Sequence, residues 1–141
     1  MFGIQWDLVC KYLEVKGRLS IADINSNSTS WGNYSNVERT ISSDKAKQGS
    51  SWTSITGTKP ASRVLLTAGA SDDTKKMNIY DFAGNEWEWT LEKTSNSYGP
   101  CAIRGGDYVF TGSGDPASDR FDNSTTGSSS NVGFRPTLYV N

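Results

Sequence analysis

The sequence contains no histidine, and this absence limits the reactions that it can catalyse. Histidine is the commonest general base near neutral pH, and it activates the nucleophile in Ser/His/Asp and Cys/His catalytic groups. Enzymes built on those groups are therefore excluded.

Cysteine is scarce as well, with Cys10 and Cys101 as the two examples. Two cysteines are too few for a disulfide scaffold, and they lie too far apart in the sequence for a zinc site without further ligands. Two interpretations stay open, namely buried free thiols and a single long-range disulfide.

Long apolar runs and a strong net charge are also missing. No stretch of about 18 apolar residues is present, and residues 1–8 lack the charged and apolar regions of a signal peptide, so we expect neither membrane insertion nor an export signal. The formal net charge is -1 with both signs interspersed, which argues against a nucleic-acid partner. A length of 141 residues fits a single domain over residues 1–141.

Glycine and small polar residues are abundant, and five Trp and six Tyr accompany them. This composition predicts short elements joined by long polar loops, with the aromatic residues supplying much of the core. Trp31, Tyr34 and Trp52 are each expected to anchor such a loop.

The apolar spacing predicts a helix over residues 2–16 that ends at Gly17. The stripe expected to face the core consists of Ile4, Leu8, Val9, Tyr12 and Leu13. Residues 20–24 extend this helix or form a second one, and residues 63–67 form an apolar run that predicts a buried strand.

The segment MNIYDFAGNEWEWT, residues 77–90, combines a turn with a strand. Alternation after the turn places Trp87 and Trp89 on one face and Glu86 and Glu88 on the other, so we expect a core strand with one solvated side. Residues 132–140 predict a final strand, in which Pro136 suits an edge or a bulge.

Three motifs in order resemble the formylglycine-generating-enzyme, or sulfatase-modifying-factor, family. They are YDFAGNEWEW at residues 80–89, RGG at residues 104–106 and GFR at residues 133–135. The resemblance implies an α+β, C-type-lectin-like fold of the formylglycine-generating-enzyme type, with mixed short strands, one or two helices and a variable loop region at about residues 105–135. It also implies that the chain corresponds to the C-terminal portion of the family domain.

The resemblance places the family's copper-binding, substrate-oxidising cysteines shortly after the RGG motif, where this chain has Phe110 and Asp115. Soft Cu(I) needs a thiolate pair, and phenylalanine cannot replace one. We therefore expect the chain not to be an enzyme.

A calcium site of the family maps onto the turn before the predicted core strand. The ligands implied are the side chains of Asp81 and Glu88 and the backbone carbonyls of Gly84 and Glu86. Ca²⁺ takes six to eight oxygen ligands, which two carboxylates, two carbonyls and water could supply. The alternative is that Asp81 caps the turn and Glu88 faces solvent.

The composition changes after Arg104, because every Lys, Glu, Gln, Met and Trp of the chain lies within residues 1–104. These five residue types cannot arise when the adenines of an AAC or AAT codon are randomised. The pattern resembles the variable region of proteins diversified by retroelements, and an ordinary polar loop is the alternative. The candidate variable, ligand-binding positions are Asp107, Tyr108, Phe110, Thr111, Asp115, Asp119, Phe121, Asp122 and Asn123.

The sequence therefore predicts a non-catalytic module that binds a protein or glycan ligand through its C-terminal loops, of the kind that retroelements diversify on a bacterial cell surface or phage particle. One alternative is a divergent formylglycine-generating oxidase. The other is a plain structural or interaction domain of a larger surface or phage protein.

Overall fold

The computed structural model describes residues 1–43, 46–49 and 51–136 and has a mixed α+β fold with two α-helices and short strands. The helices are α1 (Gly3–Val15), α2 (Ile21–Asn25) and the 3₁₀ helix η1 (Asp72–Thr74). The strands are β1 (Arg39–Thr40), β2 (Lys47–Gln48), β3 (Thr53–Ser54), β4 (Thr58–Lys59), β5 (Lys75–Lys76), β6 (Ile79–Tyr80), β7 (Trp87–Lys93), β8 (Cys101–Arg104), β9 (Arg120–Asn123) and β10 (Val132–Phe134).

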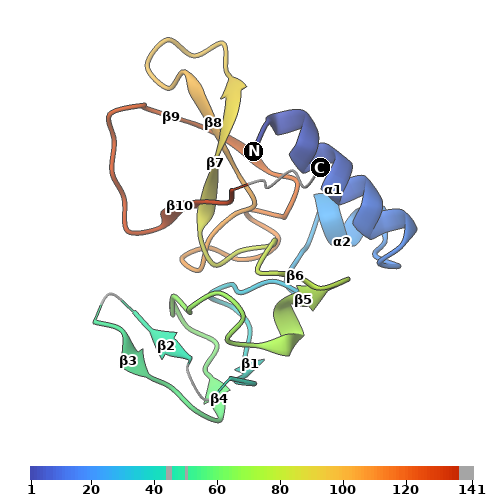
Figure 1. Ribbon diagram of the computed structural model, residues 1–141, viewed down its shortest axis with the longest axis vertical. Coiled ribbons are helices and arrows are strands. Elements are labelled where there is room, and N and C mark those ends of the chain that lie inside the picture. The colour runs from blue at the N-terminus through green and yellow to red at the C-terminus, as the bar shows by residue number, and fades with distance from the viewer. Residues whose placement is uncertain (44–45, 50, 137–141) are drawn as a thin grey trace, which may run out of the picture.

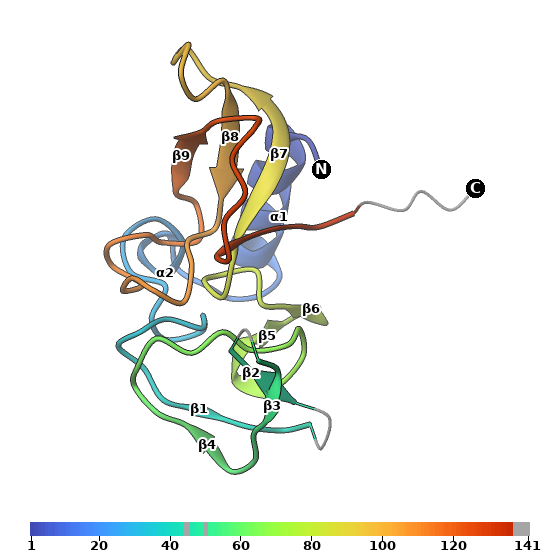
Figure 2. The ribbon, with the colours of Figure 1, turned by 90° about the vertical axis from the view of Figure 1, so that its left-hand side faces the viewer.

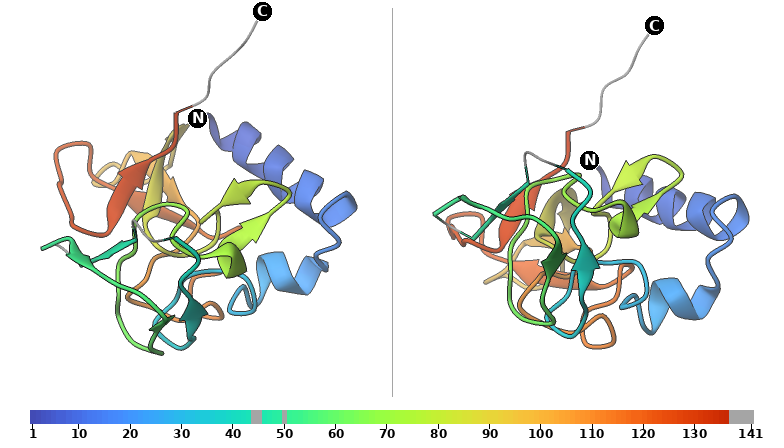
Figure 3. Two further views of the ribbon diagram at one scale, coloured as in Figure 1. Left: turned by 60° about the horizontal axis from the view of Figure 1, so that its bottom comes forward. Right: turned by 90° about the horizontal axis from the view of Figure 1, so that it is seen from below.

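One four-stranded sheet organises the molecule, in the order β10-β7-β8-β9. Strand β10 runs parallel to β7, and the other pairs are antiparallel. The sheet and α1 form the upper half of Figure 1, whereas three two-stranded sheets (β1-β4, β2-β3 and β5-β6) lie in the lower half. Long loops connect the small sheets, as both views in Figure 3 show.

The two faces of the large sheet meet different surroundings. Helix α1 lies behind β7 and β8 in Figure 2, where Asp7 accepts a hydrogen bond of 2.5 Å from the Arg104 guanidinium. Glu92 pairs with Arg120 of β9 at 2.8 Å near the same helix. The register places Trp87 beside Val132 and Ile103 beside Phe121 on the opposite face, which no helix covers among the described residues.

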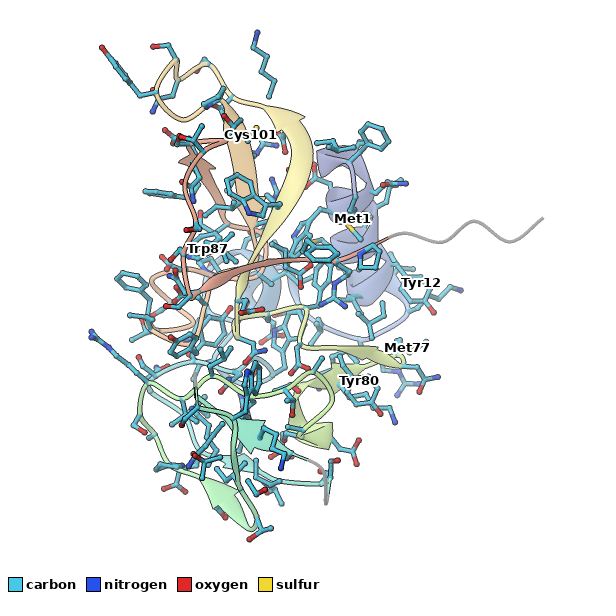
Figure 4. All side chains as sticks on the ribbon, turned by 60° about the vertical axis from the view of Figure 1, so that its left-hand side comes forward. Met1, Tyr12, Met77, Tyr80, Trp87 and Cys101 are labelled. Atoms are coloured by element: carbon cyan, nitrogen blue, oxygen red, sulfur yellow. The ribbon has the colours of Figure 1, made fainter. Side chains whose placement is uncertain are left out.

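The buried face of α1 matches the predicted apolar stripe only in part. Gly3, Trp6, Cys10 and Leu13 are buried and Val9 packs against the core, whereas Ile4, Leu8 and Tyr12 of the predicted stripe are exposed, with Leu8 at 62%. The helix carries two apolar faces, and Trp6 decides between them: its indole stacks on Phe82 at 4.0 Å between ring centroids and donates to the Ala117 carbonyl. In Figure 4, Tyr12 points away from the sheet.

Several loop predictions are confirmed. Ser20 caps α2 by accepting a hydrogen bond from the Asp23 amide, so residues 20–24 start a second helix. Trp31 and Tyr34 are buried as loop anchors. Both cysteines are free, with Cys10 buried and Cys101 half-buried, which confirms the interpretation as free thiols. Burial raises the pKa of Cys10 to about 11.

One prediction about the middle of the chain is wrong, and another is correct only in part. Trp52 is half exposed at the β2-β3 turn and is not a buried loop anchor. Residues 63–67 are not a continuous strand, but Leu65 and Leu66 are buried and Leu66 forms an isolated antiparallel bridge with Gln48 of β2. The side chain of Asn85 accepts from the Leu66 amide and donates to the Leu66 carbonyl, both at 3.0 Å. The Asn85 side chain thus satisfies the backbone groups of Leu66, while the Leu65 carbonyl and the Thr67 amide pair with the backbone of Gly49 and Lys47.

Strand β10 begins where the final strand was predicted, and residues 137–140 of that prediction lie outside the described residues. Within the described part of the chain, no helix is long and apolar enough to cross a membrane.

Candidate functional site

A cavity of about 440 Å³ lies on the sheet face opposite α1. Its lining consists of Trp87, Ile103, Phe110, Asp115, Phe121, Asn123, Ser129, Asn131 and Val132. Four of these are predicted ligand-binding positions, so the fold gathers residues from a span of the variable region into one place. In Figure 4, Trp87 marks the site on the side of β7 away from α1.

The sheet supplies an apolar floor. Trp87 and Ile103 line the cavity and are largely buried, at 5% and 3% exposed. Phe121 lies in register with Ile103, and its ring is tilted against that of Trp87 with centroids 6.1 Å apart. Phe121 is nevertheless 59% exposed, so a large aromatic surface stays open at the edge of the cavity.

The RGG motif brings a loop against this floor. Gly105 and Gly106 both have positive φ values, of 98° and 74°, which side-chain-bearing residues rarely adopt. A Cβ atom on Gly106 would lie 2.2 Å from the Asp115 carbonyl oxygen. The second glycine therefore allows the segment around Asp115 to return close to the end of β8.

Asp107 holds the two loops that flank the cavity. Its carboxylate accepts hydrogen bonds from the amides of Val109 (2.8 Å) and Phe110 (3.2 Å), and from the side-chain amide of Asn131. The side chain is fully buried. The prediction that Asp107 belongs to the contact surface is thus corrected, because its charge is used inside the loop to pair otherwise orphaned donors.

A second set of contacts fixes the same loop from the N-terminal side. The Ser28 amide donates to the Gly112 carbonyl at 2.8 Å, and the Ser35 amide donates to the Phe110 carbonyl at 2.9 Å. These bonds hold the backbone of Phe110 while its side chain remains 52% exposed. The aromatic ring is presented by a fixed loop, which lowers the entropy cost of a contact.

The remaining predicted positions lie around the cavity rather than in its lining. Tyr108, Thr111, Asp119 and Asp122 are half-buried. Asp119 lines a separate groove with Arg104 and Arg120, and Asp122 accepts a hydrogen bond from the Asn96 side chain.

Sequence reasoning missed five lining residues, namely Trp87, Ile103, Ser129, Asn131 and Val132. The alternation of residues 87–89 predicted that Trp87 is a core residue. It did not predict that Trp87 also lines a cavity.

The comparison with known protein families agrees with the order of the three motifs. A model of the sulfatase-modifying factor enzyme 1-like domain matches residues 13–138. The chain belongs to this family. No curated protein and no solved structure matches it.

Two residues of the cavity lining lie at positions to which the sulfatase-modifying-factor resemblance assigns the oxidising cysteines. Phe110 and Asp115, the positions at which it places the oxidising cysteines, both line the cavity. Neither free thiol of the chain is among the lining residues. An aromatic ring and a carboxylate therefore occupy the positions at which the resemblance places the oxidising cysteines.

Asp115 sits in an unfavourable place for its charge. Partial burial, together with the neighbouring carboxylates of Asp119 and Asp107, raises its pKa to about 6. Its carboxylate accepts no hydrogen bond and forms no ion pair with the residues that the structure describes. A positive charge in the cavity would relieve this repulsion.

The YDFAGNEWEW and GFR motifs meet through Arg135. Its guanidinium donates to both carboxylate oxygens of Glu88, at 2.6 and 2.9 Å, and to the Tyr80 and Asp81 carbonyls. Glu88 is therefore buried and paired, which corrects the expectation of a solvated glutamate face. Burial still raises the pKa of Glu88, and the pairing with Arg135 counteracts this.

The residues proposed to hold calcium are engaged with protein donors. Asp81 is buried and accepts from the Gly69 amide and the Thr74 hydroxyl, both at 2.7 Å. The Gly84 carbonyl accepts from the Glu86 amide. Among the described residues, no three acidic, cysteine or histidine side chains come together as a metal-binding group. The described arrangement does not fit a calcium ion unless Arg135 leaves Glu88.

Proposed function

We propose that the chain is a non-catalytic ligand-binding module, in which the cavity and the loops of residues 107–131 contact a protein or glycan ligand. The observation that carries this proposal is the exposure of Phe110 and Phe121 at one cavity. Exposed aromatic rings on fixed loops are what recognition surfaces use, since they offer contact area at low entropic cost.

Two features support the proposal independently of those rings. Asp107 and the Ser28 and Ser35 amides hold the flanking loops by hydrogen bonds, so the surface is largely formed before a ligand arrives. Apart from Asp107, every position marked by the codon pattern is at least partly exposed. This distribution suits a surface that tolerates variation.

We infer in addition that the scaffold is C-type-lectin-like and that retroelements diversify its loops. The support for the scaffold is the placement of α1 on one face of a small sheet, with long loops beyond the other face. Sequencing the neighbouring DNA tests the second part. A reverse-transcriptase gene and a near-identical template repeat are expected, and the absence of both would favour a plain interaction domain.

The binding experiment uses the chain against a glycan array and a panel of purified bacterial surface proteins. We expect at least one ligand whose affinity falls more than tenfold in Phe110→Ala and Phe121→Ala, while the melting temperature changes by less than about 2 °C. Phe134→Ala is the matched control, because Phe134 is 78% exposed and lies outside the cavity lining. Unfolding of both cavity variants would show that the rings support the fold.

The oxidase alternative is tested with a cysteine-containing sulfatase peptide and added copper. We expect no conversion of the cysteine, because no thiol lines the cavity. Turnover that survives Cys10→Ser and Cys101→Ser would establish an enzyme with different chemistry.

A further inference from the structure

The cavity has one charged group in its lining and no partner for it. Asp115 is the acidic residue, and neither lysine nor arginine contributes to the lining. The nearby arginines are occupied elsewhere: Arg120 pairs with Glu92, and the Arg63 Nε donates to the Val109 carbonyl. Asp107 and Asp119 add negative charge close to Asp115. The electrostatic field in the cavity therefore favours a cation and opposes an anion.

Three aromatic rings line the same cavity. Trp87 and Phe121 lie with ring centroids 6.1 Å apart, and Phe110 contributes a third ring. A cation held over such rings gains energy from their negative faces, and the gain grows as water is excluded. Ile103 and Val132 add an apolar wall that suits a hydrocarbon stem.

We propose that this cavity binds the ammonium group and methylene stem of a lysine side chain on a protein ligand, with Asp115 as its counter-charge and the rings of Trp87, Phe110 and Phe121 around the stem. The proposal rests on the ligand-binding function above and names the chemistry that the site selects. A primary ammonium is favoured over a quaternary one because it has three N–H donors. Asp115, Asn123 and Ser129 supply oxygen acceptors at the cavity.

The probe is Nα-acetyl-lysine N-methylamide, titrated into the whole chain and followed by amide and indole NMR shifts. We expect saturable shifts at Trp87, Ile103 and Phe121. The norleucine analogue has the stem without the ammonium, and the glutamate analogue reverses the charge; both are expected to bind at least tenfold more weakly. Choline serves as the quaternary ammonium source, and it is also expected to bind more weakly.

Two variants test whether the carboxylate of Asp115 is needed to bind the lysine probe. Asp115→Asn is expected to weaken lysine-probe binding at least tenfold while the fold is retained, since the change removes a poorly placed charge. Asp72→Asn, at an exposed carboxylate on η1 outside the cavity lining, is the matched control and is expected to bind normally.

The results that would contradict ammonium binding differ from those that would contradict the proposed ligand-binding function. Equal shifts from the lysine and norleucine probes, or undiminished binding to Asp115→Asn, would overturn the ammonium proposal and leave a general apolar contact site. Stronger binding of choline would overturn the choice of lysine. Shifts that avoid the cavity with every probe would overturn the ammonium proposal and weaken the proposed function as well.

Discussion

The carboxyl group of Asp115 is placed where ionisation is unfavourable. The pKa of the group is raised to about 6 from 3.8, so the folded chain binds a proton more tightly than the unfolded chain does. Well below pH 4 both states are protonated, and the side chain has no effect on stability through its charge. As the pH rises from about 4 to about 6 the unfolded state loses this proton before the folded state does, so stability falls across that window and stays at the lower level above it.

Asp115→Asn should therefore stabilise the chain in a pH-dependent way. We expect the free energy of unfolding to match that of the parent chain at about pH 3 and to exceed it by about 1 kcal/mol at pH 7 to 8, after allowance for partial solvent exposure. Urea unfolding at several pH values measures the difference. The same pH-dependent gain in Asp122→Asn would contradict the explanation.

Around the cavity, prediction from the sequence succeeded for the aromatic side chains that reach solvent and failed for Asp107, whose carboxylate has internal partners. Phe110 and Phe121 were expected on the surface and are exposed. Asp107 was assigned to the same surface, although it binds two amides and Asn131. The sequence cannot tell whether an aspartate in a polar loop is an exposed contact residue or a buried hydrogen-bond acceptor. The path of the backbone decides which donors lie within reach of its carboxylate.

At the scale of single elements, α1 shows how one large side chain orients a helix. Both faces of α1 carry apolar residues, and the stacking of Trp6 on Phe82 turns Leu13 inward and Leu8 outward. Spacing alone could not separate the two faces, because each repeats with a helical period.

A pair of alanine substitutions tests this orientation. Leu13→Ala should lower the free energy of unfolding by about 2–5 kcal/mol, since a fully buried leucine leaves a cavity. Leu8→Ala, five residues away on the exposed face, should change it by less than about 0.5 kcal/mol. Denaturant unfolding of both variants measures the two losses of stability. Equal losses would mean that Leu8 is buried as well, as the apolar stripe predicted.

Glu88 of β7 pairs with Arg135, which directly follows β10, and the sequence did not reveal this pairing. Alternation predicted a solvated Glu88, but its partner lies 47 residues away in the chain. Arg135→Met should lower stability by about 1–3 kcal/mol, because a mostly buried carboxylate loses its counter-charge. A thermal melt provides the measurement, and Glu88→Gln in the same background should restore part of the loss. A neutral Arg135→Met would show that the pair contributes little.

The same pairing occupies Glu88, one of the calcium ligands that the family resemblance implies. With Glu88 held by Arg135, we expect millimolar calcium or a chelator to leave the melting temperature of the parent chain unchanged. A calcium-dependent rise that Glu88→Gln or Asp81→Asn abolishes would establish the metal site implied by the family resemblance, and would show that Arg135 can be displaced.

On the scale of the whole molecule, the aromatic residues fall into two groups with different surroundings. Trp6, Trp31, Tyr34 and Phe82 are buried together in the core, beneath the sheet and the N-terminal loops. Phe110 and Phe121 lie at the open face, next to a cavity. The motifs of the sequence predicted the family and the mixed α+β fold, whereas the cavity depends on loop paths that no local pattern specifies.

A protease-resistance scan of all single substitutions tests the division between framework and contact surface most directly. The account predicts that nearly every substitution at Phe110, Asp115, Phe121 and Asn123 leaves the chain folded, while most substitutions at Trp6, Gly106 and Asp107 unfold it. Loss of folding at the four cavity positions to the extent seen at Trp6 would contradict it, because those residues would then belong to the core.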